Sequence, residues 1–117
     1  MLQQPDRHTQ EILDLANFLD ELPPDRYEQN RFLNEHGARC ACGWQNYRKC
    51  RMTPEDTKAA ADDLGLSDGQ AGVLFGLHPF RKIDSKQMAR TLRHLAVTGE
   101  IDLGGRTGFK LLGDLVV

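Results

Sequence analysis

The chain has 117 residues, of which 39% are hydrophobic and 27% charged, and its formal net charge is −2. This length suits one domain, residues 1–117, with one modest core, and the composition excludes wholesale disorder and a fibrous repeat. Short apolar runs exclude a membrane-spanning helix and a membrane partner, and the odd cysteine count and the lack of a secretory signal favour the reducing cytoplasm.

The first predicted element is an amphipathic helix over residues 9–22. Its apolar residues recur at the helical spacings of three, four and three, at Ile12, Leu15, Leu19 and Leu22. Pro23 and Pro24 should end it, because proline cannot continue the helical hydrogen-bond ladder. Residues 25–37 show no clean period, so we expect a packed connector with one helical turn at most.

A short helix is predicted over residues 40–50, although Gly43 weakens that prediction. Trp44 and Tyr47 are three residues apart and would share one face of this helix. Because an indole gains most by covering a core, Trp44 should be mostly buried, with Cys40 on or beside the same packed surface.

Two further helices form a predicted helix-turn-helix-like pair over residues 53–75. Thr53 as the cap and Pro54 at the first helical position favour a helix that runs to Leu64. Gly65 can end that helix in the left-handed conformation. Ser67 can then cap a second short helix that runs through Phe75.

A last helix is predicted from Asp84 to about Val97. Asp84 and Gln87 match a variant capping box, and an apolar stripe follows at Met88, Leu92 and Leu95. Pro79 should lie in a loop, and the glycine-rich residues beyond Gly99 should form a short hairpin or an extended tail. The predicted fold is therefore mainly α: a compact single-domain helical bundle with a helix-turn-helix-like pair and this C-terminal hairpin or tail.

Charge alternates in blocks along the chain. Residues 1–35 hold eight acids and three bases, and residues 54–77 hold five acids and one base. Residues 36–53 hold four bases and no acid, and residues 78–117 hold seven bases and four acids. Acidic and basic elements could join inside the fold or present separate patches to partners, and the internal arrangement is the simpler one.

The helix-turn-helix-like pair raises DNA binding as an alternative function. Reading DNA requires polar or basic side chains on the outer face of the second helix. That helix instead offers Asp68, Gly69 and Gly72, and the helix before it is acidic. A packed helical pair is the better interpretation, and the basic residues after Pro79 keep nucleic acid as an alternative partner.

A zinc site and cysteine chemistry are the remaining alternatives. His36, Cys40, Cys42 and Cys50 are suitable zinc ligands, but their spacing departs from the usual two ligand pairs. Buried structural thiols are the simpler interpretation, so we expect no cofactor and less than stoichiometric zinc in purified protein. No cysteine and histidine stand out as a catalytic pair, so we expect no enzyme, with a cysteine-dependent enzyme as the alternative.

Three short motifs run from residue 22 to residue 75. They are the Leu-Pro-Pro-Asp-Arg-Tyr run at residues 22–27, the Cys-x-x-Gly-Trp of Cys40, Gly43 and Trp44, and the Leu-Gly-Leu-Ser turn with its later Leu-Phe in residues 61–75. Together they resemble a loosely defined family of small helical bacterial and phage proteins, over roughly residues 10–100. That family has no established activity, so the resemblance implies a bacterial or phage origin and no particular chemistry.

We therefore expect a small non-enzymatic binding protein, of the kind a phage uses against a host macromolecular or defence complex. A protein partner is expected, and the oligomeric state is left open. The basic side chains expected to meet an acidic surface of that partner are Arg81, Lys82, Lys86, Arg90 and Arg93. Lys86, Arg90 and Arg93 would form one helical stripe, for which a solvated surface is the alternative interpretation.

Overall fold

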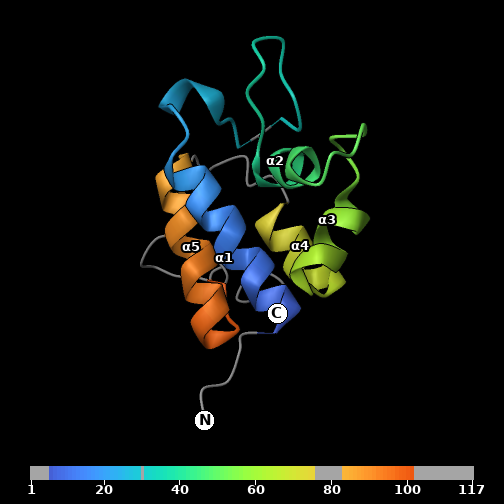
Figure 1. The fold of residues 1–117 in the computed structure, drawn as a ribbon, viewed down its shortest axis with the longest axis vertical. Coiled ribbons are helices and arrows are strands. Elements are labelled where there is room, and N and C mark those ends of the chain that lie inside the picture. Colours follow the sequence, from blue (N-terminus) through green and yellow to red (C-terminus); the bar gives the residue numbers. More distant parts are fainter. Residues whose placement is uncertain (1–5, 30, 76–82, 102–117) are drawn as a thin grey trace, which may run out of the picture.

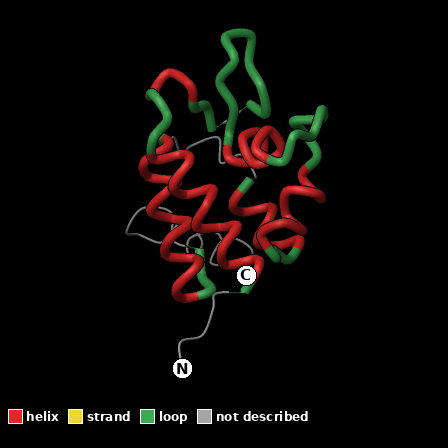
Figure 2. Tube along the Cα trace, viewed as in Figure 1, coloured by secondary structure: helices red, strands yellow, loops and turns green. Residues whose placement is uncertain are grey.

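The computed structural model describes residues 6–29, 31–75 and 83–101. Within them lie five α-helices and one 3-10 turn (Figure 1), in this order: α1 (Arg7–Asp20), the 3-10 turn (Pro24–Arg26), α2 (Ala41–Arg48), α3 (Thr57–Leu64), α4 (Asp68–Leu74) and α5 (Ser85–Thr98). No strand occurs among the described residues (Figure 2), which confirms the mainly α prediction. None of the described helices has the length and apolar character needed to cross a membrane.

The two long helices, α1 and α5, lie side by side and carry the centre of the core (Figure 1). The predicted stripes are buried in both: Ile12, Leu15 and Leu19 in α1, and Met88, Leu92 and Leu95 in α5. Each stripe covers the other because apolar residues three and four apart fall on one helical face. Helix α1 begins two residues earlier than predicted, since the side chain of Asp6 caps it by accepting from the Thr9 amide at 2.7 Å.

Helix α2 packs against α1 and α3, and Trp44 and Cys40 are buried as predicted. Trp44 is 7% exposed and Cys40 2% exposed, and both belong to the same core. The indole Nε1 donates to the carbonyl oxygen of Arg26 at 2.9 Å, which ties α2 to the end of the 3-10 turn. Gly43 fits within this helix because a β-carbon there would meet the backbone carbonyl of Phe32.

The predicted start of α3 at Thr53 and Pro54 is wrong. The helix begins at Thr57, and Asp56 is its cap, accepting from the Ala59 amide at 3.0 Å. The preceding residues form a turn whose carbonyls at Pro54 and Asp56 each accept from the buried Asn46 side chain at 3.1 Å. The local sequence of this segment favours a helix, but the contact from Asn46 of α2 holds the segment in a turn.

Helix α1 ends at Asp20, two residues before the predicted Leu22, whereas the predicted end of α3 and the predicted starts of α4 and α5 are confirmed. Gly65 ends α3 in the left-handed region with φ of 70°, and Ser67 and Gln70 form a reciprocal capping box at the start of α4. Asp84 and Gln87 form a second capping box at the start of α5, which ends at Gly99 with φ of 77°. The loop predicted at Pro79 and the predicted C-terminal hairpin or tail lie outside the described residues.

Candidate functional site

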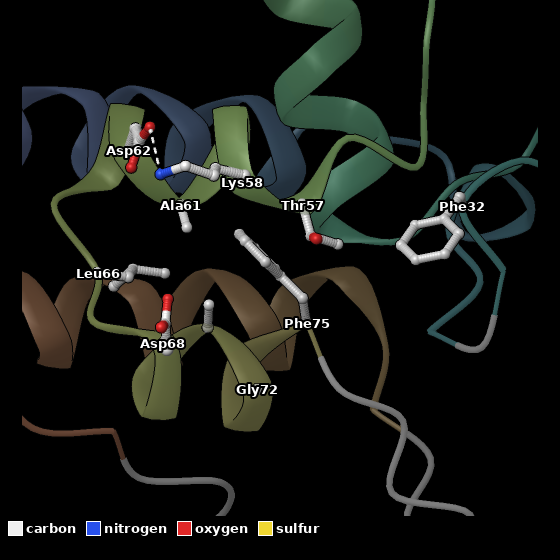
Figure 3. A pocket seen from close by; sticks show the side chains of 10 residues that line it. Phe32, Thr57, Lys58, Ala61, Asp62, Leu66, Asp68, Gly72 and Phe75 are labelled. Atoms are coloured by element: carbon white, nitrogen blue, oxygen red, sulfur yellow. Dashed lines mark hydrogen bonds and ion pairs between the residues drawn. The ribbon is translucent and has the colours of Figure 1, made fainter.

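A groove of about 400 Å³ lies between α3 and α4. Figure 3 shows its lining, with Phe32 near one end and Leu66 near the other. Its apolar surface is made of Phe32, Ala61, Leu66, Ala71 and Phe75. The rest of the lining is Thr57, Lys58, Asp62, Asp68 and Gly72.

Helical spacing places these residues on facing sides of the two helices. In α3 the lining residues recur at Thr57 and Ala61, and in α4 and its cap at Asp68, Gly72 and Phe75. Residues three and four apart share one helical face, so each helix turns a single side to the groove. The Gly65 turn brings the two faces together.

The charged groups at the groove leave an acidic balance. Lys58 Nζ lies 3.4 Å from Asp62 Oδ2, and both side chains are exposed, at 85% and 65%. A surface ion pair of this kind contributes little to stability. Asp68 is exposed and pairs with no cation among the described residues. Approaching ligands therefore meet, beside an apolar surface, one carboxylate that no described cation neutralises.

The groove lining does not assemble a reactive centre. It includes neither cysteine nor histidine, and its titratable side chains are the exposed Lys58, Asp62 and Asp68. Covalent catalysis needs a nucleophile, a base that activates it and a group that orients the base. The lining suits the burial of apolar groups rather than a chemical step.

The three basic residues predicted to form one stripe, Lys86, Arg90 and Arg93, are not all free of ion pairs. Lys86 and Arg93 both reach α1, where Arg93 Nη1 lies 3.1 Å and Lys86 Nζ 3.6 Å from the Asp20 carboxylate. Hydrogen bonds from Arg93 hold the pKa of Asp20 below its ordinary value against a small opposing effect of burial. Arg90 is exposed and pairs with no described acid. Arg81 and Lys82 lie outside the described residues.

The four candidate zinc ligands are not brought together. No group of three or more His, Cys, Asp or Glu side chains in the described part of the chain could hold a metal ion. His36 is 81% exposed beside Glu35, and Cys50 is exposed, whereas Cys40 and Cys42 are buried in the core. The structure therefore does not assemble these four residues into one site.

The surroundings of the two buried thiols, Cys40 and Cys42, do not activate them as nucleophiles. Burial raises the pKa of Cys40, and burial followed by the charge of Cys40 raises the pKa of Cys42 to about 12. Cys42 Sγ donates to the carbonyl oxygen of Pro54 at 3.6 Å, so it acts as a packed neutral thiol. A reactive cysteine requires a lowered pKa, which neither buried thiol has.

Sequence reasoning identified the α3–α4 pair but missed the groove between its helices. The sequence indicated only that Gly69 and Gly72 of α4 cannot read DNA bases. In the structure a β-carbon at Gly72 would meet no atom within 4 Å, so this position leaves open space beside the helix. No local signal could have placed Phe32 at the groove, because it comes from the connector that precedes α2.

Comparison of the chain with protein-family models, with curated proteins and with solved structures finds no match.

Proposed function

We propose that this chain is a non-enzymatic binding protein, and that its protein partner places apolar side chains in the α3–α4 groove. The observation that carries the proposal is the groove itself: a concave lining of five apolar side chains between two helices, of which Ala61 and Phe75 are buried and the others partly buried. Concave sites lined mainly by apolar side chains with a few polar groups are common binding sites.

The shape and the charge of the groove favour a helical or extended peptide segment of the partner. Grooves between helices commonly receive the apolar face of an amphipathic segment, with a few side chains as anchors. Asp68, which no described cation neutralises, would favour a basic residue beside such an anchor. The host macromolecular or defence complex expected from the sequence stays a prediction.

The basic residues of α5 support this proposal less well. Two of the three described ones, Lys86 and Arg93, already neutralise Asp20, so a partner would have to compete with an internal pair. Arg90 remains available on the exposed side of α5 and could add to an interface centred elsewhere.

Filling the groove tests the proposal, and α4 offers a matched pair of positions. Gly72 lines the groove, and a β-carbon there would meet no atom within 4 Å. Gly69 lies in the same helix, does not line the groove and is equally open, with Ser67 Oγ at 4.0 Å as its nearest neighbour. Gly72→Leu and Gly69→Leu should each stabilise the helix by about 1 kcal/mol, but only Gly72→Leu should block the groove.

The measurement is affinity capture from host extract with the wild type and both variants immobilised, followed by calorimetry with each captured protein. A partner should bind the wild type and Gly69→Leu equally and bind Gly72→Leu at least about tenfold more weakly. Equal binding to all three proteins contradicts the groove. Capture of DNA with an affinity that falls steeply with salt would instead support the regulator alternative.

A further inference from the structure

A second surface feature lies apart from the groove, on the aromatic face of α2. Trp44 and Tyr47 meet edge to face with ring centroids 5.2 Å apart, and Phe18 of α1 lies 5.4 Å from the Trp44 ring. Trp44 is buried, whereas Tyr47 is 53% exposed. The cluster therefore has one side in the core and one side in water.

Arg39 lies over both of these rings. Its guanidinium carbon is 5.3 Å from the Trp44 ring centroid and 5.0 Å from that of Tyr47. These distances are within the range of cation–π attraction, which both rings exert on the guanidinium. Because the rings hold the group in place, a ligand would not have to order a flexible side chain.

Among the described residues, none supplies an anion to Arg39. Its Nε is buried without a hydrogen-bond acceptor, and the side chain makes no ion pair with a described acid. The nearby arginines of the same basic block differ in this respect, since Arg48 pairs with Glu11 at 3.4 Å and Arg51 with Asp63 at 2.7 Å. Nε of Arg39 itself is enclosed and out of reach of a ligand, so the donors left for one are Nη1 and Nη2, for which no described residue supplies an acceptor.

We propose that Arg39, held on the rings of Trp44 and Tyr47, binds a carboxylate of an aspartate or glutamate side chain on a protein partner. The guanidinium offers paired donors whose geometry matches the two oxygens of a carboxylate. Exposed Tyr47 gives an apolar side chain next to that carboxylate a surface to cover. Tyrosine and arginine are also the residues that most often dominate binding energy at protein interfaces.

The surroundings favour a single carboxylate over a nucleic acid. Phosphate backbones are held by several lysines and arginines that each neutralise one phosphate. Here the neighbouring cations, Arg48 and Lys49, are already paired with Glu11, and Arg48 also approaches Asp14. Arg26 and Arg31 also make no ion pair with a described acid, but among the described residues only Arg39 lies over the rings of Trp44 and Tyr47, so the rings present one guanidinium to one acidic side chain.

The test uses the full chain and two small peptides, acetyl-Leu-Glu-Leu-amide and acetyl-Leu-Gln-Leu-amide. Trp44 is the chain's single tryptophan, so its fluorescence reports binding at Arg39 directly. The glutamate peptide should produce a saturable change, and the glutamine peptide should bind about tenfold more weakly, because it cannot form charge-assisted hydrogen bonds.

The variants separate a binding role from a packing role. Arg39→Gln should abolish preference for the glutamate peptide, and Arg39→Lys, which keeps the charge but loses the paired donors, should retain only part of it. If Arg39→Gln does not fold, judged by circular dichroism, Arg39→Lys carries the test. Arg31→Gln is the control, since it removes an exposed arginine of the same connector.

Equal binding of both peptides to the wild type would overturn the proposal. An unchanged preference for the glutamate peptide in folded Arg39→Lys and Arg39→Gln would overturn it as well. Tighter binding of a single-stranded oligonucleotide than of the glutamate peptide would also overturn it. Gly72→Leu should bind the glutamate peptide like the wild type. The peptide test of Arg39 and the partner-binding test of the α3–α4 groove can therefore fail separately.

Discussion

Gly43 and Gly72 both lie inside helices, but their surroundings differ completely. At Gly43 a β-carbon would meet the backbone carbonyl of Phe32 and approach the β-carbon of Arg39 to 2.9 Å. At Gly72 it would meet nothing within 4 Å. The Cys-x-x-Gly-Trp motif therefore needs glycine at position 43, because the connector approaches α2 too closely there for a side chain.

The same substitution should change stability in opposite directions at these two positions. Gly43→Ala should lower the free energy of unfolding by about 2 kcal/mol, because a backbone carbonyl cannot move aside as a side chain can. Gly72→Ala should raise it by about 1 kcal/mol, because alanine favours the helix. Urea unfolding of the two variants and the wild type measures both effects, and shifts of equal sign would contradict this account.

At the scale of elements, Asp20 links the two long helices. It accepts the charges of both Lys86 and Arg93 across the α1–α5 interface, and Arg93 Nη2 also donates to Asn17 Oδ1 at 2.9 Å. The acidic N-terminal block and the basic C-terminal block are joined here, as the internal arrangement of charge predicted. The Arg93 side chain is therefore already engaged in holding α5 against α1.

Charge reversal at Arg93 should therefore lower the melting temperature. Arg93→Glu places a carboxylate against Asp20, whereas Arg90→Glu changes an exposed residue without a described acidic partner. We expect a clear loss for Arg93→Glu, little change for Arg90→Glu, and recovery when Arg93→Glu is combined with Asp20→Arg. Equal melting temperatures for the two single variants would show that the pair is not structural.

At the scale of the whole molecule, one polar network joins α1, α2 and α3. Arg51 Nη1 and Nη2 donate to the two oxygens of Asp63 at 2.7 and 2.8 Å, and Gln45 donates to both Asp63 and Glu11. Burial tends to raise the pKa of Asp63, but the hydrogen bonds from Arg51 and Gln45 outweigh it and lower the pKa below 3.8. The network therefore needs Asp63 to be ionised.

The sign of the pH dependence follows from that lowered pKa. Asp63 stabilises the fold fully above its unfolded pKa, and this contribution is lost as the pH falls through the lower folded pKa. Asp63→Asn should cost about 2 kcal/mol at neutral pH, and its difference from the wild type should shrink as the pH falls below 3.8. Urea unfolding across this pH range measures the difference.

Asp62→Asn is the matched control for this experiment. Asp62 is the neighbouring residue of α3, but it is exposed and pairs only with exposed Lys58 among the described residues. Its replacement should change stability little at any pH. If Asp63→Asn lowers the free energy of unfolding by the same amount from neutral to acid pH, the ionised carboxylate of Asp63 is not what stabilises the network.

Most of the helical pattern could be predicted from the sequence because it depends on neighbours in the chain. The stripes of α1 and α5 and the capping boxes at Ser67 and Asp84 involve residues three or four apart, as does the glycine stop at residue 65. The burial of Trp44 followed from its size and its apolar neighbours.

Only the tertiary structure determined where α3 starts, which basic side chains remain free and where the candidate sites lie. Asn46 holds the segment before Asp56 in a turn, Asp20 engages Lys86 and Arg93, and Phe32 completes the groove. Each of these contacts joins residues on different elements, often dozens of positions apart in the chain. Local propensity is worth only tenths of a kcal/mol per residue, so a single buried hydrogen bond or ion pair can override it.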